Sequence, residues 1–329
     1  MNYDIITFGS ATHDVFMTSR ELQVVESEKF ITKKGLCVPL GSKMRMESVF
    51  FAMGGTGTNS AASFSEQELN TAYFGAIGKD AFGQEVKKEL SRHNVSLDLI
   101  QESDKESTAF SVIISLPDVD RSILEKYGAC HELTENDIPF DKLKAKWFYI
   151  SSLSSKSHQI LGPLVEFAKK NNIKISSNPA GSVKTPENTE ILKSALNKID
   201  ILILNQEESA GLTGLDFNNE KEIFKKLDDW VDGIVVMTKG PKGVSVSDGK
   251  NIYSAGIPKS GLVDRTGAGD AFGAAFTAGW IEKRDISYAI QLGTANATSV
   301  LQKMGATNGI LKKGEWGEWP KVEVEISKA

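Results

Sequence analysis

Strand-like and helix-like segments alternate along most of this 329-residue chain. Short apolar runs rich in β-branched and aromatic residues favour buried strands, whereas apolar residues spaced three and four apart favour helices. Strands are expected at 5–9, 71–77, 146–150, 173–177, 199–204 and 233–238, and helices at 59–68, 81–92, 158–171, 187–196, 220–230, 268–281 and 287–302. Such an order predicts an α/β fold, with helices on both faces of a mainly parallel sheet.

The alternation breaks in two places. Segments 28–32 and 48–53 resemble strands with no helix between them, and 110–116 and 121–126 resemble a second, hairpin-like pair. We therefore expect a small β lid on a larger α/β core. The lid would comprise residues 14–53 and 108–126, and the core residues 1–13, 54–107 and 127–329.

A glycine-rich turn leads directly into a helix at residues 263–272. Thr266, Gly267 and Gly269 allow a tight turn, and free N–H groups at a helix N-terminus form an anion site that the helix dipole assists. Asp270 would repel a bound phosphate, so its position suggests a base beside an anion site. Phosphoryl transfer to a hydroxyl needs that combination. The alternative is a plain helix cap after an ordinary turn.

A second glycine motif occupies residues 54–62 and precedes another helical pattern. Gly54 and Gly55 allow a polyhydroxylated ligand to approach the backbone closely. The amide of Asn59 offers hydrogen-bond donors and an acceptor, which suits sugar hydroxyls. The alternative is that Asn59 caps the helix that follows.

Together these motifs resemble the signatures of the PfkB/ribokinase family of small-molecule kinases. Residues 264–272 resemble the C-terminal signature, 54–59 the N-terminal signature, and 74–83 the strand–turn–helix segment between them. The similarity extends from about residue 4 to about residue 310. It implies a ribokinase-like three-layer sandwich with a β lid. It also implies an ATP-dependent kinase that transfers the γ-phosphoryl group of Mg-ATP to a hydroxyl of a sugar.

The resemblance also implies which residues react and bind the acceptor. Asp270 would be the base, and Gly267, Ala268 and Gly269 would form the anion hole. The acceptor would be bound by Asp14, Gly54, Gly55 and Asn59. Asp14 would lie at the carboxyl end of the first strand, where the ligand crevice of an open α/β sheet lies. The alternative for Asp14 is an ordinary turn residue.

Nucleotide and cation sites follow from the same resemblance. The nucleotide would contact Asn205, Thr238, Lys239, Gly240, Gly243, Gly269 and Thr294. Glu208 would meet magnesium through water, since magnesium prefers oxygen ligands and retains its waters. Potassium is a candidate for a monovalent site behind the anion hole, in a shell of Asp264, Thr266, Val300, Lys303, Gly305 and Gly309. The alternatives are helix capping at 205–208, a hairpin turn at 239–243 and a turn role for Asp264.

Two departures leave the acceptor open. Thr56 stands where ribokinases have a lysine, and the segment 148–153 lacks an acidic residue that they offer the sugar, so ribose itself is not supported. A phosphosugar would need basic residues such as Lys43 or Arg45, which are more simply solvated lid charges. The alternatives to a sugar kinase are a nucleoside kinase of the same family and a non-catalytic sugar- or nucleotide-binding regulator. The joint presence of Asp270, Asn205 and Glu208 argues against the regulator.

Composition narrows the class of partners. The chain has a net charge of −5, and its acidic and basic residues are interspersed. This pattern favours neither nucleic acid nor an anionic membrane as a binding partner. No window holds the roughly 18 apolar residues of a membrane span, and the N-terminus does not resemble a signal peptide. Cys37 and Cys130 are too few for a disulfide framework, which indicates a cytoplasmic protein. A homodimer formed through the β lid is compatible with the resemblance.

Overall fold

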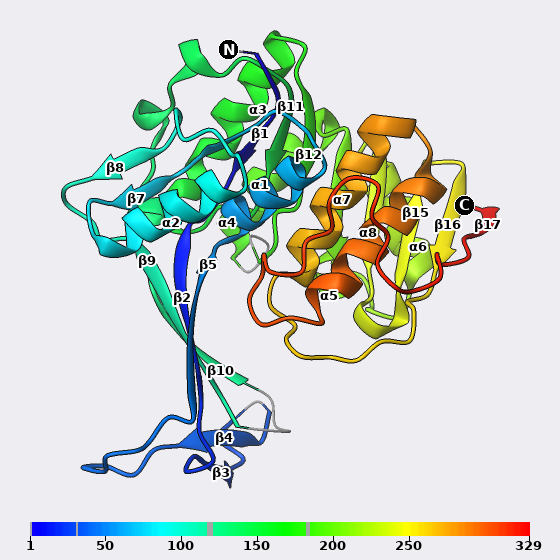
Figure 1. The fold of residues 1–329 in the computed structure, drawn as a ribbon. Helices are drawn as coiled ribbons and strands as arrows, with labels where there is room; N and C mark the ends of the chain where they lie inside the picture. Colours follow the sequence, from blue (N-terminus) through cyan, green and yellow to red (C-terminus); the bar gives the residue numbers. More distant parts are fainter. Residues whose placement is uncertain (1, 31, 117–120, 182–184) are drawn as a thin grey trace.

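A nine-stranded sheet forms the centre of the protein (Figure 1). The structure is a computed structural model that describes residues 2–30, 32–116, 121–181 and 185–329. The strand order is β17-β16-β15-β14-β13-β12-β11-β1-β6. The parallel strands are β1 (Tyr3–Phe8), β6 (Thr71–Phe74), β11 (Ala145–Ile150), β12 (Lys174–Ser177), β13 (Ile201–Asn205) and β14 (Ile234–Thr238). Antiparallel strands complete one edge, namely β15 (Val244–Ser247), β16 (Asn251–Ala255) and β17 (Glu325–Lys328).

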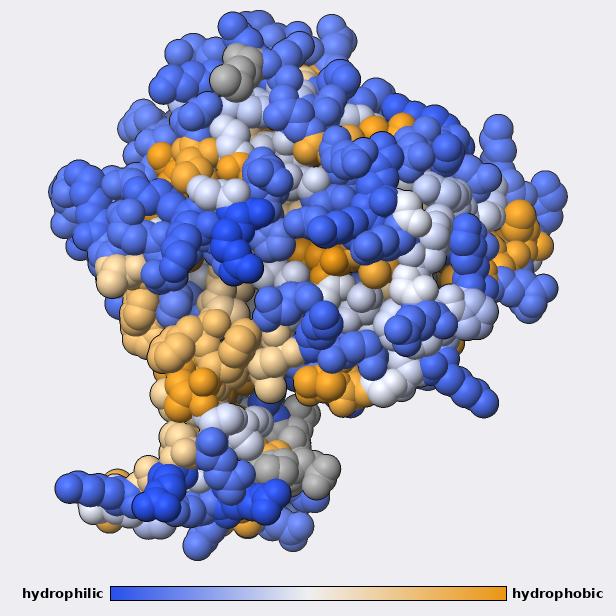
Figure 2. All heavy atoms as spheres, viewed as in Figure 1, coloured by the Kyte–Doolittle hydropathy of each residue, from blue (hydrophilic) through white to orange (hydrophobic). Residues whose placement is uncertain are grey.

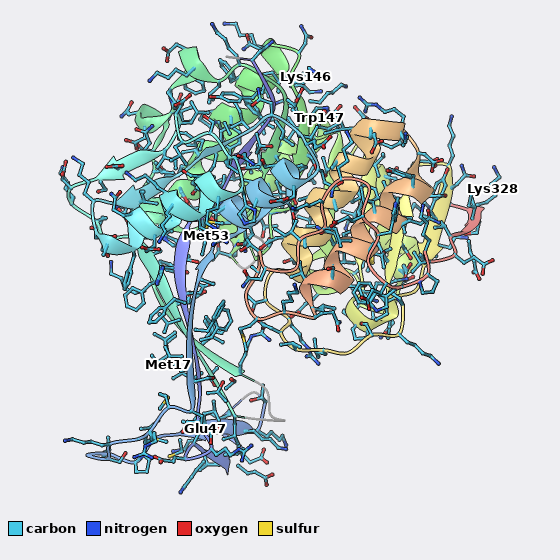
Figure 3. All side chains as sticks on the ribbon, in the orientation of Figure 1. Met17, Glu47, Met53, Lys146, Trp147 and Lys328 are labelled. Carbon is cyan, nitrogen blue, oxygen red and sulfur yellow. The ribbon has the colours of Figure 1, made fainter. Side chains whose placement is uncertain are left out.

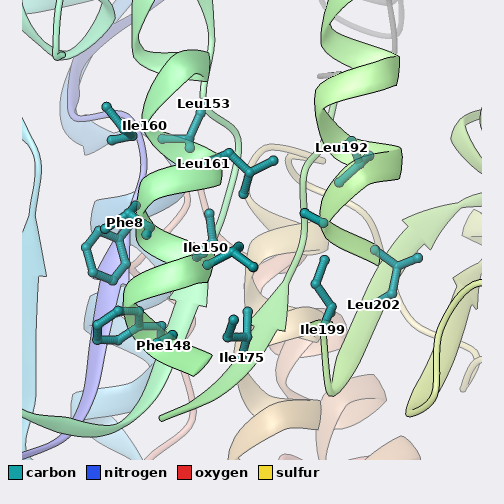
Figure 4. Close-up of a cluster of buried hydrophobic side chains, with 14 of the residues drawn as sticks. Phe8, Phe148, Ile150, Leu153, Ile160, Leu161, Ile175, Leu192, Ile199 and Leu202 are labelled. Atoms are coloured by element: carbon teal, nitrogen blue, oxygen red, sulfur yellow. The ribbon is translucent and has the colours of Figure 1, made fainter. Parts of the chain in front are cut away.

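Helices cover both faces of this sheet, as predicted. One face packs against α3 (Leu161–Lys170), α4 (Pro186–Ala195), α5 (Gln206–Thr213) and α6 (Glu220–Asp228). The other packs against α1 (Thr56–Glu66), α7 (Ala268–Lys283) and α8 (Ile286–Val300), and α2 (Ala81–Arg92) packs beside α1. Side chains alternate between the faces: Phe148 and Ile150 of β11 join the first cluster (Figure 4), whereas Trp147 and Tyr149 join the second. Because both faces are buried, these strands are almost continuously apolar, which made them recognisable in the sequence.

Two helices differ from the sequence expectation in ways that affect the site. Helix α1 begins at Thr56 rather than at residue 59, so Asn59 lies inside the helix and Gly55 is the N-cap. The prediction that a helix starts at Asn59 is therefore wrong. Helix α5 was not among the helices expected from periodicity, because an eight-residue helix is too short to show a clear apolar period; only the capping alternative at 205–208 pointed to it.

A second, four-stranded sheet projects from the main body (Figure 1). Its order is β10-β9-β2-β5, with β2 (Thr12–Thr18), β5 (Ser48–Gly54), β9 (Ala109–Ser115) and β10 (Arg121–Lys126). Met53 of β5 lies beside the main body, whereas Glu47 lies near the far end of the sheet (Figure 3). The strands predicted at 48–53, 110–116 and 121–126 are confirmed.

A hairpin of β3 (Gln23–Glu26) and β4 (Lys34–Cys37) lies at the far end of this sheet (Figure 1). The strand predicted at 28–32 is wrong, because the described part of this segment belongs to the turn that joins β3 to β4; residue 31 lies outside the described residues. The amide of Phe30 donates to the Ser27 carbonyl at 3.1 Å, and that of Lys33 to the Phe30 carbonyl at 2.9 Å. A local turn therefore satisfies this backbone.

The strand predicted at 71–77 also breaks. It divides at Gly75 into β6 and β7 (Ala76–Gly78), and β7 pairs with β8 (Gln101–Ser103) in a separate two-stranded sheet. A Cβ on Gly75 would lie 1.9 Å from the Tyr73 hydroxyl oxygen, so only glycine fits at this break.

Apolar side chains are exposed on the four-stranded sheet. Val49, Phe51 and Leu124 expose 47%, 59% and 59% of their surface. Figure 2 shows apolar spheres gathered over this sheet beneath the main body. Within the described ranges, no helix combines the length and the apolar character that crossing a membrane requires.

Candidate active site

The N-terminus of α7 is the centre of the candidate site. Gly267 is its N-cap and adopts a φ of 77°, in the left-handed region that favours glycine. A Cβ on Gly267 would lie 2.3 Å from Cβ of Ala306, so the turn also depends on close packing against the segment after α8. The helix starts at Ala268, and Asp270 lies in its first turn. Local sequence therefore explains the position of the carboxylate and, together with that packing, the turn.

Two cavities border this helix N-terminus, each lined by different residues of the segment. The first, which we call the acidic cavity, has a volume of about 210 Å³ and is lined by Thr266, Gly267 and Asp270 of this segment. The second, which we call the apolar cavity, has a volume of about 350 Å³ and is lined by Arg265, Ala268 and Gly269. The turn and the first helical residues thus contribute to both cavities.

Asp270 is held by a residue from the other glycine motif. Nδ2 of Asn59 donates a hydrogen bond of 2.9 Å to Oδ2 of Asp270. Burial raises the pKa of Asp270 to about 7; the hydrogen bond from Asn59 opposes this rise, and the nearby charge of Asp14 adds to it. A carboxyl group that titrates near neutral pH is suited to accept a proton from a hydroxyl.

Asp14 is the second carboxylate of the acidic cavity. It lies on β2, so the expectation that it ends the first strand is wrong: β1 ends at Phe8 and the chain then turns into the four-stranded sheet. Oγ1 of Thr12 donates to Oδ1 of Asp14 at 2.9 Å. Burial raises the pKa of Asp14 to about 6, against the hydrogen bonds from Thr12 and Ser111, and the charges of Glu125 and Asp264 raise it further.

Gly54 and Gly55 allow other parts of the protein to pack closely against this backbone. A Cβ on Gly54 would lie 1.9 Å from Oδ2 of Asp14, and one on Gly55 would lie 2.5 Å from the carbonyl oxygen of Ser10. Gly55 also lines the acidic cavity, whereas Gly54 does not appear in its lining. Close packing against β2 therefore accounts for Gly54 without a ligand.

Sequence reasoning missed several residues that line the acidic cavity. They come from the loop before β2, from α1 and from the four-stranded sheet, and are Ser10, Thr12, Thr56, Ser111, Ile113, Ile123 and Glu125. Alternation along β9 and β10 was the available signal, because every second residue of a strand shares a face. That signal does not say which face meets the cleft.

A third cavity of about 240 Å³, which we call the adjoining cavity, continues from the acidic cavity. The two share Ser10, Thr12, Thr56, Ser111 and Glu125 in their linings. The adjoining cavity is also lined by Phe110, Tyr127 and His131, and the rings of Tyr127 and His131 stack with centroids 4.0 Å apart.

The apolar cavity brings together most residues predicted to bind the nucleotide. Thr238, Gly240, Gly243, Gly269 and Thr294 all line it. Lys239 does not: its ammonium donates to the Glu220 carboxylate at 3.1 Å and to the Ser245 hydroxyl at 2.7 Å. Asn205 is also absent from this lining, although it pairs in register with Thr238 in the sheet.

Asn205 and Glu208 form a capping box at the start of α5. Oδ1 of Asn205 accepts from the Glu208 amide at 2.8 Å, and Oε2 of Glu208 accepts from the Asn205 amide at 2.9 Å. Oε1 of Glu208 accepts from the Gly181 amide at 2.9 Å. The capping alternative for these residues is thus observed. Each carboxylate oxygen has a second lone pair, so a magnesium-bound water can still be accommodated.

The residues predicted to form the monovalent-cation shell come from the turn before α7 and from the end of α8 and the segment after it. Asp264 is buried, and its Oδ1 accepts from the Thr266 amide and hydroxyl at 3.0 and 2.8 Å, while Oδ2 accepts from the Gly305 amide at 3.1 Å. A Cβ on Gly309 would lie 2.7 Å from Cα of Val300, so these segments are in contact. The amide of Lys303 donates to the Val300 carbonyl at 3.1 Å. Within the described ranges no cluster of three or more His, Cys, Asp or Glu side chains could hold a metal ion.

Comparison with known proteins identifies the family. The model of the pfkB family of carbohydrate kinases matches residues 24–313. The chain belongs to the pfkB family. Relatives include the ribokinase of Lactococcus lactis, 30% identical over 279 residues that cover 82% of this chain and 87% of that protein. The cytidine kinase of Thermococcus kodakarensis is 28% identical over 194 residues, covering 58% and 64% of the two chains.

A solved structure confirms the architecture. The complex of a ribokinase II from E. coli with ATP and Mg²⁺ superposes with a TM-score of 0.79, at 18% identity, over 94% of this chain and 96% of that one. The ribokinase-like three-layer fold is confirmed. As a pfkB kinase the chain is an ATP-binding phosphotransferase with an alcohol group as acceptor, of the class that acts on sugars or nucleosides.

Proposed function

We propose that this pfkB protein transfers the γ-phosphoryl group of ATP to a hydroxyl of a neutral sugar. One observation carries the proposal: the N-terminus of α7 presents Asp270 to the acidic cavity and Ala268 and Gly269 to the apolar cavity. An acceptor and a donor bound in these cavities would meet at the amides of the helix N-terminus.

The residues then have distinct roles in the transfer. Asp270 takes the proton from the attacking hydroxyl, whose oxygen forms the new bond to phosphorus as the bond to the ADP oxygen breaks. Asn59 orients Asp270 through their 2.9 Å hydrogen bond. The amides of Gly267, Ala268 and Gly269 stabilise the charge on the transferring group. Asp14 accepts hydrogen bonds from other hydroxyls of the acceptor.

Two cations complete the proposal. Mg²⁺ would neutralise the phosphate charge. Glu208 would accept a hydrogen bond from a magnesium-bound water rather than coordinate the ion directly. K⁺ would lie among the segments that contain Asp264, Thr266, Val300, Lys303, Gly305 and Gly309, and would order the turn ahead of Asp270. Asp264, which is buried and whose carboxylate accepts from N–H and O–H groups, is the anionic residue that fits such a cation.

The charge of the acidic cavity selects the acceptor. Its ionisable lining residues are Asp14, Glu125 and Asp270, and no Lys, Arg or His from the described ranges lines it. A phosphosugar would be repelled there. Arg45 cannot neutralise this negative charge, because it lies far from the cavity. Its carbonyl accepts from the hydroxyl of Ser19, which follows the last residue of β2, whereas Asp14 lies near the start of β2. A neutral polyol fits this charge pattern.

A nucleoside acceptor is the second candidate. The adjoining cavity continues from the acidic cavity and carries Phe110, Tyr127 and His131, rings against which a base could stack. A nucleoside would occupy both cavities, whereas a monosaccharide would need only the acidic one.

We also propose a domain organisation and an assembly. Residues 14–53 and 108–126 would act as the lid of a core made of residues 1–13, 54–107 and 127–329. The exposed Val49, Phe51 and Leu124 support a homodimer formed through that lid, since a second copy would cover apolar surface.

An acceptor screen tests the proposed function. Purified protein with Mg-ATP would be incubated with a panel of neutral sugars, phosphosugars and nucleosides, and ADP release measured. We expect turnover with a neutral sugar, and none with phosphosugars. Turnover confined to nucleosides would select the second candidate, and ADP release with phosphosugars alone would overturn the charge argument.

A further inference from the structure

Arg265 differs from every other residue that lines the apolar cavity. The lining consists otherwise of glycine, proline, aliphatic, phenylalanine, serine and threonine residues, so Arg265 is the charged member among the described residues. It immediately precedes Thr266 and Gly267, which line the acidic cavity instead. This segment therefore contributes a cation to the apolar cavity and Asp270 to the acidic cavity.

The apolar cavity has chemically distinct ends. Val244, Ile257, Leu262 and Leu301 supply an aliphatic part that suits a nucleobase. Ala268 and Gly269 supply the helix N-terminus, which attracts phosphate. Arg265 is two residues before the N-cap of this helix and lines the same cavity as Ala268 and Gly269.

The cation of Arg265 would offset the negative charge near the phosphate end of the cavity. A helix N-terminus offers only about half a positive charge. Beyond it lie Asp14, Glu125 and Asp270, whose negative charge disfavours a nearby triphosphate. The apolar cavity offers no other cationic side chain within the described ranges. A guanidinium at this position offsets that repulsion, and its planar set of donors matches two phosphate oxygens at once.

The backbone holds Arg265 in place while its side chain is exposed. The preceding residue, Asp264, is buried, and its carboxylate accepts from the Gly305 amide. The same carboxylate accepts from the amide of Thr266, the residue that follows Arg265. No hydrogen bond or ion pair of the Arg265 side chain occurs in the described part of the chain, and the residue is exposed. Its guanidinium is thus available to a ligand.

We propose that Arg265 binds the terminal phosphate of the nucleotide and is a determinant of donor affinity. This inference rests on the proposed function, because it takes the apolar cavity to be the nucleotide site. The guanidinium would donate hydrogen bonds to oxygens of that phosphate, whereas Asp270 lines the other cavity. Its contribution would grow with the number of phosphates and vanish for a nucleoside.

Calorimetric titration of Arg265→Gln, Arg265→Lys and wild-type protein with ATP, ADP and adenosine, in Mg²⁺ and without acceptor, tests the proposal. Lys259→Gln is the matched control, since Lys259 is an exposed cation of the same loop that does not line the cavity. We expect Arg265→Gln to weaken ATP binding roughly 10- to 100-fold, ADP binding less and adenosine binding less than two-fold. Arg265→Lys should be intermediate, and Lys259→Gln close to wild type.

The outcomes separate the two claims. ATP binding within two-fold of wild type in Arg265→Gln would overturn the role of Arg265 and leave the proposed function intact. Equal losses for ATP and adenosine would also overturn it, because they would indicate a disturbed cavity rather than a lost phosphate contact. Failure of the wild-type protein to bind ATP would instead contradict the proposed function.

Discussion

At the scale of single residues, the site depends on two carboxyl groups with raised pKa values. Burial moves the pKa of Asp14 to about 6 and that of Asp270 to about 7, and the two groups repel each other. Keeping both ionised at neutral pH costs stability, because folding disfavours the charged form of each group.

Asp270→Asn tests the base. The substitution preserves size but cannot accept the proton, so kcat should fall by roughly 10²- to 10⁴-fold. The dissociation constant of ATP should change little. Steady-state kinetics and calorimetry measure the two quantities, and a kcat within a few-fold of wild type would remove Asp270 from this role.

Asn59→Ala tests the orienting hydrogen bond through pH. Asn59 donates to the Asp270 carboxylate and so favours its charged form; without it the pKa of Asp270 should rise above its value of about 7. Because the deprotonated form is active, the acid limb of the kcat profile should move to higher pH. A lower kcat with an unmoved acid limb would contradict this role.

Asp14→Asn should weaken acceptor binding and increase the free energy of unfolding. Its folded pKa of about 6 exceeds the ordinary 3.8, so the ionised group destabilises the fold. The cost is absent below pH 3.8, increases as pH rises toward 6 and is complete above it. We expect the variant to gain on the order of 2–3 kcal/mol of unfolding free energy at pH 8 and almost none at pH 3.5.

Urea unfolding at both pH values measures the gain, and the acceptor KM should rise strongly in the same variant. An equal gain at both pH values would show that the pKa of Asp14 is not raised by folding.

At the scale of elements, the α7 turn and the segment after α8 act as one unit. Asp264 bonds to Gly305, and Gly267 packs against Ala306. The geometry of the amides at the helix N-terminus therefore depends on chain that is about 40 residues away. Anything that orders this pair of segments should affect catalysis.

Replacing K⁺ by tetramethylammonium at constant ionic strength tests the proposed cation at this unit. The bulky ion cannot enter a shell of carbonyl oxygens, so the turn should lose order and kcat should fall several-fold. Restoring K⁺ should restore activity. Kinetic constants that stay the same in both salts would exclude a functional site.

At the scale of the whole molecule, the four-stranded sheet both lines the acidic cavity and exposes apolar surface. Its strands supply Asp14, Ser111 and Glu125 to the acidic cavity, while other residues of the same sheet expose apolar surface. A dimer formed there would fix the sheet that carries acceptor-binding groups.

The double variant Phe51→Lys and Leu124→Lys tests the dimer. Charges on this surface should convert a dimer to a monomer, as measured by light scattering after size-exclusion chromatography. Ile326→Lys changes an exposed apolar residue on β17 and serves as control. A wild-type protein that is monomeric at micromolar concentration would contradict the proposed assembly.

Local sequence determined the parts of this protein that depend on neighbours in the chain. The buried parallel strands are continuous apolar runs, and the turn at Gly267 needs a left-handed residue followed by a helix, so both were predictable. Three of the four strands of the second sheet were predicted, at 48–53, 110–116 and 121–126, whereas β2 was not. The strand predicted at 28–32 is wrong, because its described residues form the turn between β3 and β4.

Tertiary structure alone decided how distant residues meet. Asn59 and Asp270 are 211 positions apart, and no local pattern says that one donates to the other. Lys239 belongs to the predicted nucleotide turn, yet the proximity of Glu220 and Ser245 draws its ammonium away from the cavity. Glu125 and Asp270 line the same cavity only because β10 of the second sheet and the N-terminus of α7 come together in the fold. Periodicity and propensity act over a few residues, whereas these contacts depend on how whole elements pack.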